Sequence, residues 1–174
     1  GQYQILDMFC GKGRLCRAVP MRHCNLYTGV DCNEPAIVEA RNVNAHYRFE
    51  LLDATIHRWK AHCILLWTAV SMLNDDDILP FLQSLDAQWI IIGEICGRDW
   101  RTPGSVQHPA IYNRDWHEYP DLLAQAGYAL SHAEAQPHVH YSTPAWNGMR
   151  DTGIHTFVFR RDNDWQFYKE ARVR

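Results

Sequence analysis

The chain has 174 residues, enough for one domain with its own hydrophobic core, since domains of about 100–150 residues are the commonest. Its 47% hydrophobic and 21% charged residues are typical of a globular protein, and its net charge of −3 disfavours nucleic acid as a partner. No apolar run approaches the roughly 18 residues of a membrane-spanning helix, and the first residues lack the features of a signal peptide. We therefore expect one cytoplasmic domain over residues 1–174 without membrane contact, with a core over 3–161 and a tail over 162–174.

The first half of the chain alternates between predicted strands and helices. A strand over residues 3–9 precedes a helix near 14–22, which Pro20 should shorten or kink. A strand over 26–31 is followed by a helix near 34–46, with Asn33 as a suitable N-cap and Pro35 in its first turn. The next two strands cover 47–52 and 62–70. Such alternation implies parallel strands with helices on both faces of the sheet.

The second half continues the alternation and ends on two strands. Asp75, Asp76 and Asp77 begin a helix near 76–86, where their charges suit the helix dipole. A strand covers 88–95, and a helix near 114–126 ends at Gly127. Strands over 128–135 and 154–161 follow without a helix between them, which implies one antiparallel pair at an edge of the sheet.

Two stretches, residues 96–113 and 136–153, show little periodicity. Long irregular loops in a compact domain are commonly functional, and the first one leaves the end of a predicted strand, where such sheets bind ligands. We expect both stretches to form an acceptor pocket, although their aromatic side chains could instead only anchor the loops. The histidines and aromatic residues in and beside them are His108, Tyr112, Trp116, His138, His140, Tyr141 and Trp146.

The cysteines and histidines form no recognisable metal-binding pattern. The six cysteines contain no C-x-x-C pair, which favours a reduced protein over a disulfide framework. His138 and His140 could converge with His155, but nothing in the sequence places the three side chains together. We expect no metal ion.

The turn after the first strand is the most informative segment. Gly11 and Gly13 let the backbone approach a ligand, and Asp31, at the tip of the second strand, can accept both hydroxyls of a ribose. The phosphate loop of nucleotide hydrolases is excluded, because Leu6 stands where it needs glycine. The dinucleotide fingerprint is excluded as well, because Cys16 stands at its third glycine.

An acid, Asp7, begins this loop, where it would repel a pyrophosphate and suit an amino-acid ammonium group. The segment Asp7-x-Phe9-Cys10-Gly11-x-Gly13 resembles motif I of the class I S-adenosylmethionine-dependent methyltransferases. Later segments are similar to the same family in order and spacing, over roughly residues 3–161. The resemblance implies an α/β, doubly wound, Rossmann-like fold with a mostly parallel seven-stranded sheet, in the order 3-2-1-4-5-7-6 with the last strand antiparallel.

The resemblance also implies the cofactor, S-adenosylmethionine. Asp31 stands where the family's second-strand acid binds the ribose, and Asp53 where an acidic side chain contacts the adenine amino group. The cofactor-binding residues implied in this way are Asp7, Phe9, Gly11, Gly13, Arg14, Asp31, Cys32, Asp53, Ala54, Thr68 and Val70.

Methyl transfer requires an acceptor in line with the sulfonium, and proximity and orientation supply most of the rate. A histidine can also remove the proton of a hydroxyl or ammonium acceptor, because its pKa lies near neutrality. The candidate catalytic residues are His108, His138 and His140, with Glu94 at the end of the fifth strand as an orienting acid. The candidate substrate-binding residues are Tyr112, Tyr141 and Trp146.

The predicted acceptor is an oxygen, in preference to a nitrogen, of a small molecule or glycan. The fourth strand lacks the Asn/Asp-Pro-Pro-Tyr/Phe signature of many enzymes that methylate exocyclic amines of bases, and Val70-Ser71-Met72-Leu73 stands there instead. No helix is predicted before the first strand, which suggests a compact enzyme with an open site or an excised domain of a longer protein. A homo-oligomer also stays open.

Two other functions stay open beside methyl transfer. The chain could bind the cofactor without catalysis, as a partner subunit or scaffold. It could also be a different nucleotide-dependent transferase or an NAD enzyme on a similar sheet. The intact set of Asp7, Gly11, Gly13, Asp31 and Asp53 argues against a decayed cofactor site.

Overall fold

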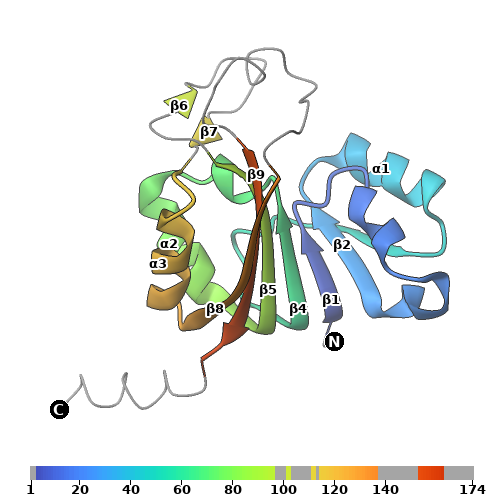
Figure 1. Cartoon of the computed structure of the whole chain (residues 1–174). Coiled ribbons are helices and arrows are strands. Elements are labelled where there is room, and N and C mark those ends of the chain that lie inside the picture. Colours follow the sequence, from blue (N-terminus) through green and yellow to red (C-terminus); the bar gives the residue numbers. More distant parts are fainter. Residues whose placement is uncertain (1–2, 97–100, 103–110, 113, 137–152, 163–174) are drawn as a thin grey trace.

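A computed structural model describes residues 3–96, 101–102, 111–112, 114–136 and 153–162. Its centre is a seven-stranded sheet in the order β3-β2-β1-β4-β5-β9-β8, which confirms the predicted order (Figure 1). The strands are β1 (Tyr3–Met8), β2 (Tyr27–Asp31), β3 (Arg48–Leu51), β4 (Trp59–Trp67), β5 (Leu85–Cys96), β8 (Tyr128–Gln136) and β9 (Gly153–Arg161). Strands β1 to β5 pair in parallel, whereas β9 is antiparallel to both β5 and β8.

The described residues form three α-helices, with α2 and α3 on one face of the sheet and α1 on the other (Figure 1). Helix α1 (Glu34–Val43) begins where the Asn33 side chain accepts a hydrogen bond from the Ala36 N–H, as predicted for this N-cap. The Asn74 side chain caps α2 (Asp75–Ser84) in the same way. Helix α3 (Glu118–Gln125) is shorter than predicted and is followed by Gly127 at a φ of 89°.

The predicted helix near residues 14–22 is wrong in type. The segment forms two 3₁₀ helices, η1 (Arg14–Ala18) and η2 (Met21–Leu26). Pro20 lies between them, where it cannot donate a backbone hydrogen bond to continue the first helix. The chain therefore reaches β2 through two tight turns instead of one α-helix.

Two hydrophobic clusters lie on opposite faces of the sheet, because successive strand residues point to opposite faces. The first cluster contains Leu6 and Met8 of β1 with residues of α2 and α3. The second contains Tyr27 and Phe49 with residues of η1 and α1. In β4 and β5, residues on the α2–α3 face such as Ile64 are fully buried, whereas Cys63, Leu65 and Ile91 on the other face are only half-buried.

The stretch predicted to be irregular after the fifth strand contains a short ladder. Strands β6 (Arg101–Thr102) and β7 (Ile111–Tyr112) pair in antiparallel fashion and form a separate small sheet. Within the ranges given above, no helix has the length and apolar character needed to cross a membrane.

Candidate cofactor site

The loop that joins β1 to η1 has an unusual backbone. Phe9, Gly11 and Gly13 have positive φ angles of 58°, 52° and 73°. The Gly13 N–H donates to the Cys10 carbonyl over 2.9 Å, and the Cys10 N–H donates to the Val30 carbonyl at the end of β2 over 3.1 Å. These contacts fold the loop back over the carboxyl ends of β1 and β2, where ligands of doubly wound sheets bind.

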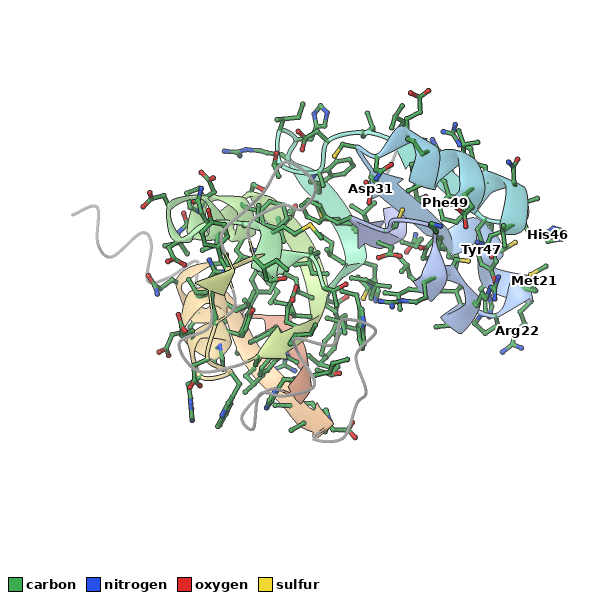
Figure 2. The ribbon with its side chains drawn as sticks, turned by 90° about the horizontal axis from the view of Figure 1, so that it is seen from above. Met21, Arg22, Asp31, His46, Tyr47 and Phe49 are labelled. Atoms are coloured by element: carbon green, nitrogen blue, oxygen red, sulfur yellow. The ribbon has the colours of Figure 1, made fainter. Side chains whose placement is uncertain are left out.

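Asp31, labelled in Figure 2, is the last residue of β2 and is hydrogen-bonded to this loop. One of its carboxylate oxygens accepts the Gly11 N–H over 2.8 Å, and the other accepts the Asn33 N–H over 2.8 Å. Each oxygen keeps a free lone pair for a further donor, because a carboxylate has about four acceptor positions. The carboxylate is therefore fixed in place and still able to bind hydroxyl groups.

Phe49 of β3 explains why glycine is needed at two positions of this region. A Cβ atom on Gly13 would lie 2.5 Å from the Phe49 ring, and one on Gly29 would lie 2.8 Å from it. In contrast, a Cβ on Gly11 would meet nothing within 4 Å. Gly13 and Gly29 thus allow close packing beneath the loop, whereas Gly11 leaves open space.

A cavity of about 590 Å³ lies over these strand ends, within the usual size of a small-molecule site. It brings together seven of the predicted cofactor residues, namely Asp7, Phe9, Gly11, Arg14, Asp31, Cys32 and Thr68. Six further described residues that line it were not predicted, namely Cys10, Lys12, Leu15, Asn33, Trp67 and Met72. Four predicted residues do not line it, namely Gly13, Asp53, Ala54 and Val70.

Asp7 contributes the buried acid of the cavity. Its side chain is 2% exposed, and one of its oxygens accepts the hydroxyl of Tyr27. Burial raises the pKa of Asp7 to about 7, while the Tyr27 hydrogen bond and the nearby Arg14 charge act in the opposite direction. A bound cation would favour the ionised form of this carboxyl group. Tyr27 was not predicted, because its role depends on a contact 20 residues away in the chain.

The β4 side of the cavity is formed by Trp67, Thr68 and Met72. Thr68 has a φ of 52°, and its N–H donates to the Gly93 carbonyl over 2.7 Å. The Trp67 indole lies directly on Gly93, since a Cβ there would come within 2.3 Å of the ring. The third 3₁₀ helix, η3 (Val70–Met72), continues from this wall toward α2.

Glu94 lies below η3 and is fully buried. Its Oε1 accepts the Ala69 and Val70 N–H groups over 2.6 Å each and the Ser71 N–H over 3.4 Å. Its other carboxylate oxygen has no hydrogen-bond partner among the residues that the structure describes. Burial raises the pKa of Glu94 to about 7, although the backbone N–H groups favour its ionised form.

The Arg114 side chain binds carbonyl groups of the same turn, and Arg114 is 1% exposed. Its guanidinium donates to the Val70 carbonyl over 3.3 Å and to the Leu73 carbonyl over 2.9 Å. It also forms an ion pair of 2.8 Å with Asp75 and donates to the Tyr112 carbonyl of β7. Arg114 was not predicted, because it lies more than 40 residues from the carbonyls of η3 and Leu73.

The remaining predicted residues lie apart from the cavity or outside the described residues. The Asp53 carboxylate accepts the N–H and hydroxyl of Thr55, and these hydrogen bonds lower its pKa. Tyr112 is half-buried in β7. Outside the described residues lie His108, His138, His140, Tyr141 and Trp146. Among the residues that are described, no three histidine, cysteine or acidic side chains form a group that could hold a metal ion.

No protein-family model matches the chain, and no curated protein sequence matches it. Solved structures do match. An S-adenosylmethionine-dependent methyltransferase from Methanosarcina mazei has a TM-score of 0.69 at 13% identity, covering 91% of this chain and 92% of that one. The 1,6-didemethyltoxoflavin-N1-methyltransferase of Burkholderia thailandensis has a TM-score of 0.67 at 15% identity, covering 91% and 71%. The [4+2]-cyclase SpnF has a TM-score of 0.65 at 16% identity, covering 92% and 76%.

These similarities establish the fold. The chain has the Rossmann-like fold of the class I S-adenosylmethionine-dependent methyltransferases, as its sequence predicts. The covered share of the other protein varies widely, and the chain spans only 43% of one similar structure, described as a pericyclic reaction enzyme. A shared fold alone does not specify the activity, the cofactor or the acceptor.

Proposed function

We propose that this chain is a methyltransferase that uses S-adenosylmethionine to methylate an oxygen of a small molecule or glycan. The observation that carries the proposal is the position of Asp31. Its carboxylate lines the cavity at the tip of β2 and is held by the Gly11 N–H of the loop after β1. A ribose whose hydroxyls bind Asp31 would lie beside that loop, at the position where doubly wound sheets bind nucleosides.

The residues present fit this cofactor. Gly11 leaves space beside the loop, because an added Cβ there would meet no atom within 4 Å. Asp7 offers a buried carboxyl group to the cationic part of the ligand. Because burial raises the pKa of Asp7, a cation bound beside this group would promote its ionisation. When bound, the cofactor supplies an activated methyl group on a sulfonium. The protein then has to orient the acceptor and remove its proton.

The choice of oxygen rests on the sequence. Val70-Ser71-Met72-Leu73 replaces the signature of many enzymes that methylate exocyclic amines. In the structure, the N–H groups of Val70 and Ser71 point to Glu94, and Met72 lines the cavity. The turn therefore lacks the polar groups of that signature, which argues against an exocyclic amine of a base as the acceptor.

Calorimetric titration with S-adenosylmethionine and its demethylated product tests the cofactor, with NAD and ATP as controls. We expect binding of the first two alone. Asp31→Ala should weaken that binding by roughly 100-fold, because two hydrogen bonds to a charged group are lost. Asp86→Ala, at the opposite end of β5, is the matched control and should bind like the wild type. Tight binding of NAD, with no response to S-adenosylmethionine, would contradict the proposal.

Transfer of a labelled methyl group to hydroxyl acceptors, including sugars and glycans, tests the reaction. We propose His108 as the base, with His138 and His140 as alternatives. His108→Asn should lower kcat without changing the affinity for S-adenosylmethionine, since a base acts on the acceptor. An unchanged kcat would exclude His108 as the base and leave His138 and His140 as the candidates.

A cofactor-binding protein without methyl transfer is the second candidate. The observation in its favour is that one similar structure is described as a [4+2]-cyclase, so the fold is not confined to proteins named as methyltransferases. The two candidates differ in one result. Binding of S-adenosylmethionine without transfer of its label to any acceptor would favour the second.

A further inference from the structure

We infer that Glu94 and Arg114 are positioning residues that together hold the β4–η3 turn as one wall of the cofactor cavity. This inference rests on the proposed function, because it assigns their role to the same site. It also differs from the role predicted for Glu94, which was to orient a catalytic histidine.

We call Glu94 and Arg114 together the clamp, and Glu94 is its first half. Three successive N–H groups, those of Ala69, Val70 and Ser71, converge on its Oε1. The strand β5 supplies this acceptor from directly below the turn, next to Gly93, whose carbonyl accepts the Thr68 N–H. Four consecutive N–H groups of the turn are therefore fixed by two neighbouring residues of β5.

The second half is Arg114, which holds the carbonyl side of the same turn. Its guanidinium bonds the carbonyls of Val70 and Leu73, which lie on either side of Met72. The Asp75 carboxylate at the start of α2 fixes the guanidinium in turn. The turn is thus bound by an acceptor on its N–H side and a donor on its carbonyl side.

The clamped turn carries two side chains that line the cavity, Thr68 and Met72. Neither Glu94 nor Arg114 lines the cavity itself, so their effect on a ligand has to pass through the turn. Met72 is 49% exposed, which means that packing alone does not fix its position. The backbone hydrogen bonds of the clamp supply that constraint.

Burial of these charged groups is costly, which argues against a purely structural reason for them. Within the described part of the chain, one oxygen of the Glu94 carboxyl group has no partner, so its burial loses hydration without full compensation. Apolar residues of similar size often stabilise a core better than buried charges do. A requirement to place the turn accurately explains why an acid and a guanidinium occupy these buried positions.

Hydrogen exchange tests the clamp without any ligand. In the wild type, the amides of Ala69 and Val70 should exchange slowly. Glu94→Ala should accelerate their exchange, because it removes the shared acceptor. Glu94→Gln should restore slow exchange, because its amide oxygen can still accept these N–H groups. Equal exchange in all three proteins would overturn the clamp.

Calorimetric titration with S-adenosylmethionine tests the role of the clamp. Glu94→Ala and Arg114→Met should raise Kd by about tenfold, the effect of losing one good hydrogen bond. Glu94→Gln should recover most of the affinity. The matched control is Arg161→Met, because Arg161 also donates to two backbone carbonyls, those of Leu85 and Ala87, at the far end of β5.

The control separates positioning from general stability. Arg161→Met should lower Tm and leave Kd unchanged. A wild-type Kd in both Glu94→Ala and Arg114→Met would overturn the inference while the proposed function stands. Absence of binding to the wild type would overturn the proposed function itself, whereas the exchange experiment would still report on the clamp.

Discussion

The ionisation of Asp7 predicts that cofactor binding depends on pH. In the free protein, the pKa of the Asp7 carboxyl group is about 7, so this group is largely protonated below neutral pH. A cationic cofactor favours the carboxylate, and binding must then release a proton at low pH. The affinity for S-adenosylmethionine should therefore rise several-fold between about pH 6 and pH 8. Calorimetry across this range measures the effect.

Two variants separate Asp7 from other titrating groups. Asp7→Asn should bind more weakly and lose most of the pH dependence. Tyr27→Phe removes a hydrogen bond that lowers the pKa of Asp7, so the rise in affinity should move to higher pH. If Asp7→Asn keeps the wild-type pH profile, the titrating group lies elsewhere.

The packing of β3 against the loop after β1 depends on one glycine. Gly13 combines a φ of 73° with a Cβ position only 2.5 Å from the Phe49 ring. Gly13→Ala should lower the free energy of unfolding by about 2–4 kcal/mol, the sum of backbone strain and overpacking. Urea denaturation gives this value.

Gly11→Ala is the matched control for this prediction. It has a similar φ of 52°, but its added Cβ would meet no atom within 4 Å. It should cost only about 1 kcal/mol from the left-handed backbone. Phe49→Leu should reduce the cost of Gly13→Ala in a double-mutant cycle and leave that of Gly11→Ala unchanged. Equal losses of unfolding free energy in Gly13→Ala and Gly11→Ala would show that the Phe49 ring can move aside without an energetic cost.

Most elements could be predicted because their signals are local. Alternation of apolar segments and caps such as Asn33 indicated the strands and helices. The two 3₁₀ helices around Pro20 were missed, because their short turns bury little and show no clear apolar period. The fourth strand also begins earlier than predicted, at Trp59, whose indole donates to the Ala54 carbonyl.

The site was only partly predictable for a related reason. Asp7, Gly11 and Asp31 stand at fixed positions relative to predicted strands, so their meeting follows from the order of the sheet. The positions of Trp67 and Arg114 instead depend on contacts between side chains and distant backbone. Only the packed structure brings such groups together.

The cavity lies where the two hydrophobic clusters meet. Cys10, which lines the cavity, belongs to the cluster on the α1 face. Phe9, which also lines it, packs against the cluster on the α2–α3 face. The centroids of the Phe9 and Phe81 rings are 5.8 Å apart. A ligand in the cavity would therefore contact both halves of the fold, which otherwise meet mainly through the sheet.

Ligand binding should consequently stabilise the molecule as a unit. At a concentration of S-adenosylhomocysteine about 100 times Kd, linkage adds about 2.7 kcal/mol to the free energy of unfolding. For a chain of this length, that corresponds to a rise in Tm of roughly 5–10 °C. Asp31→Ala should show almost no rise at the same concentration, since its Kd is raised. Differential scanning calorimetry should show one unfolding transition, and its Tm should rise when the ligand is added. Two transitions, of which only one moves with ligand, would mean that the clusters unfold separately and that the cavity belongs to one of them.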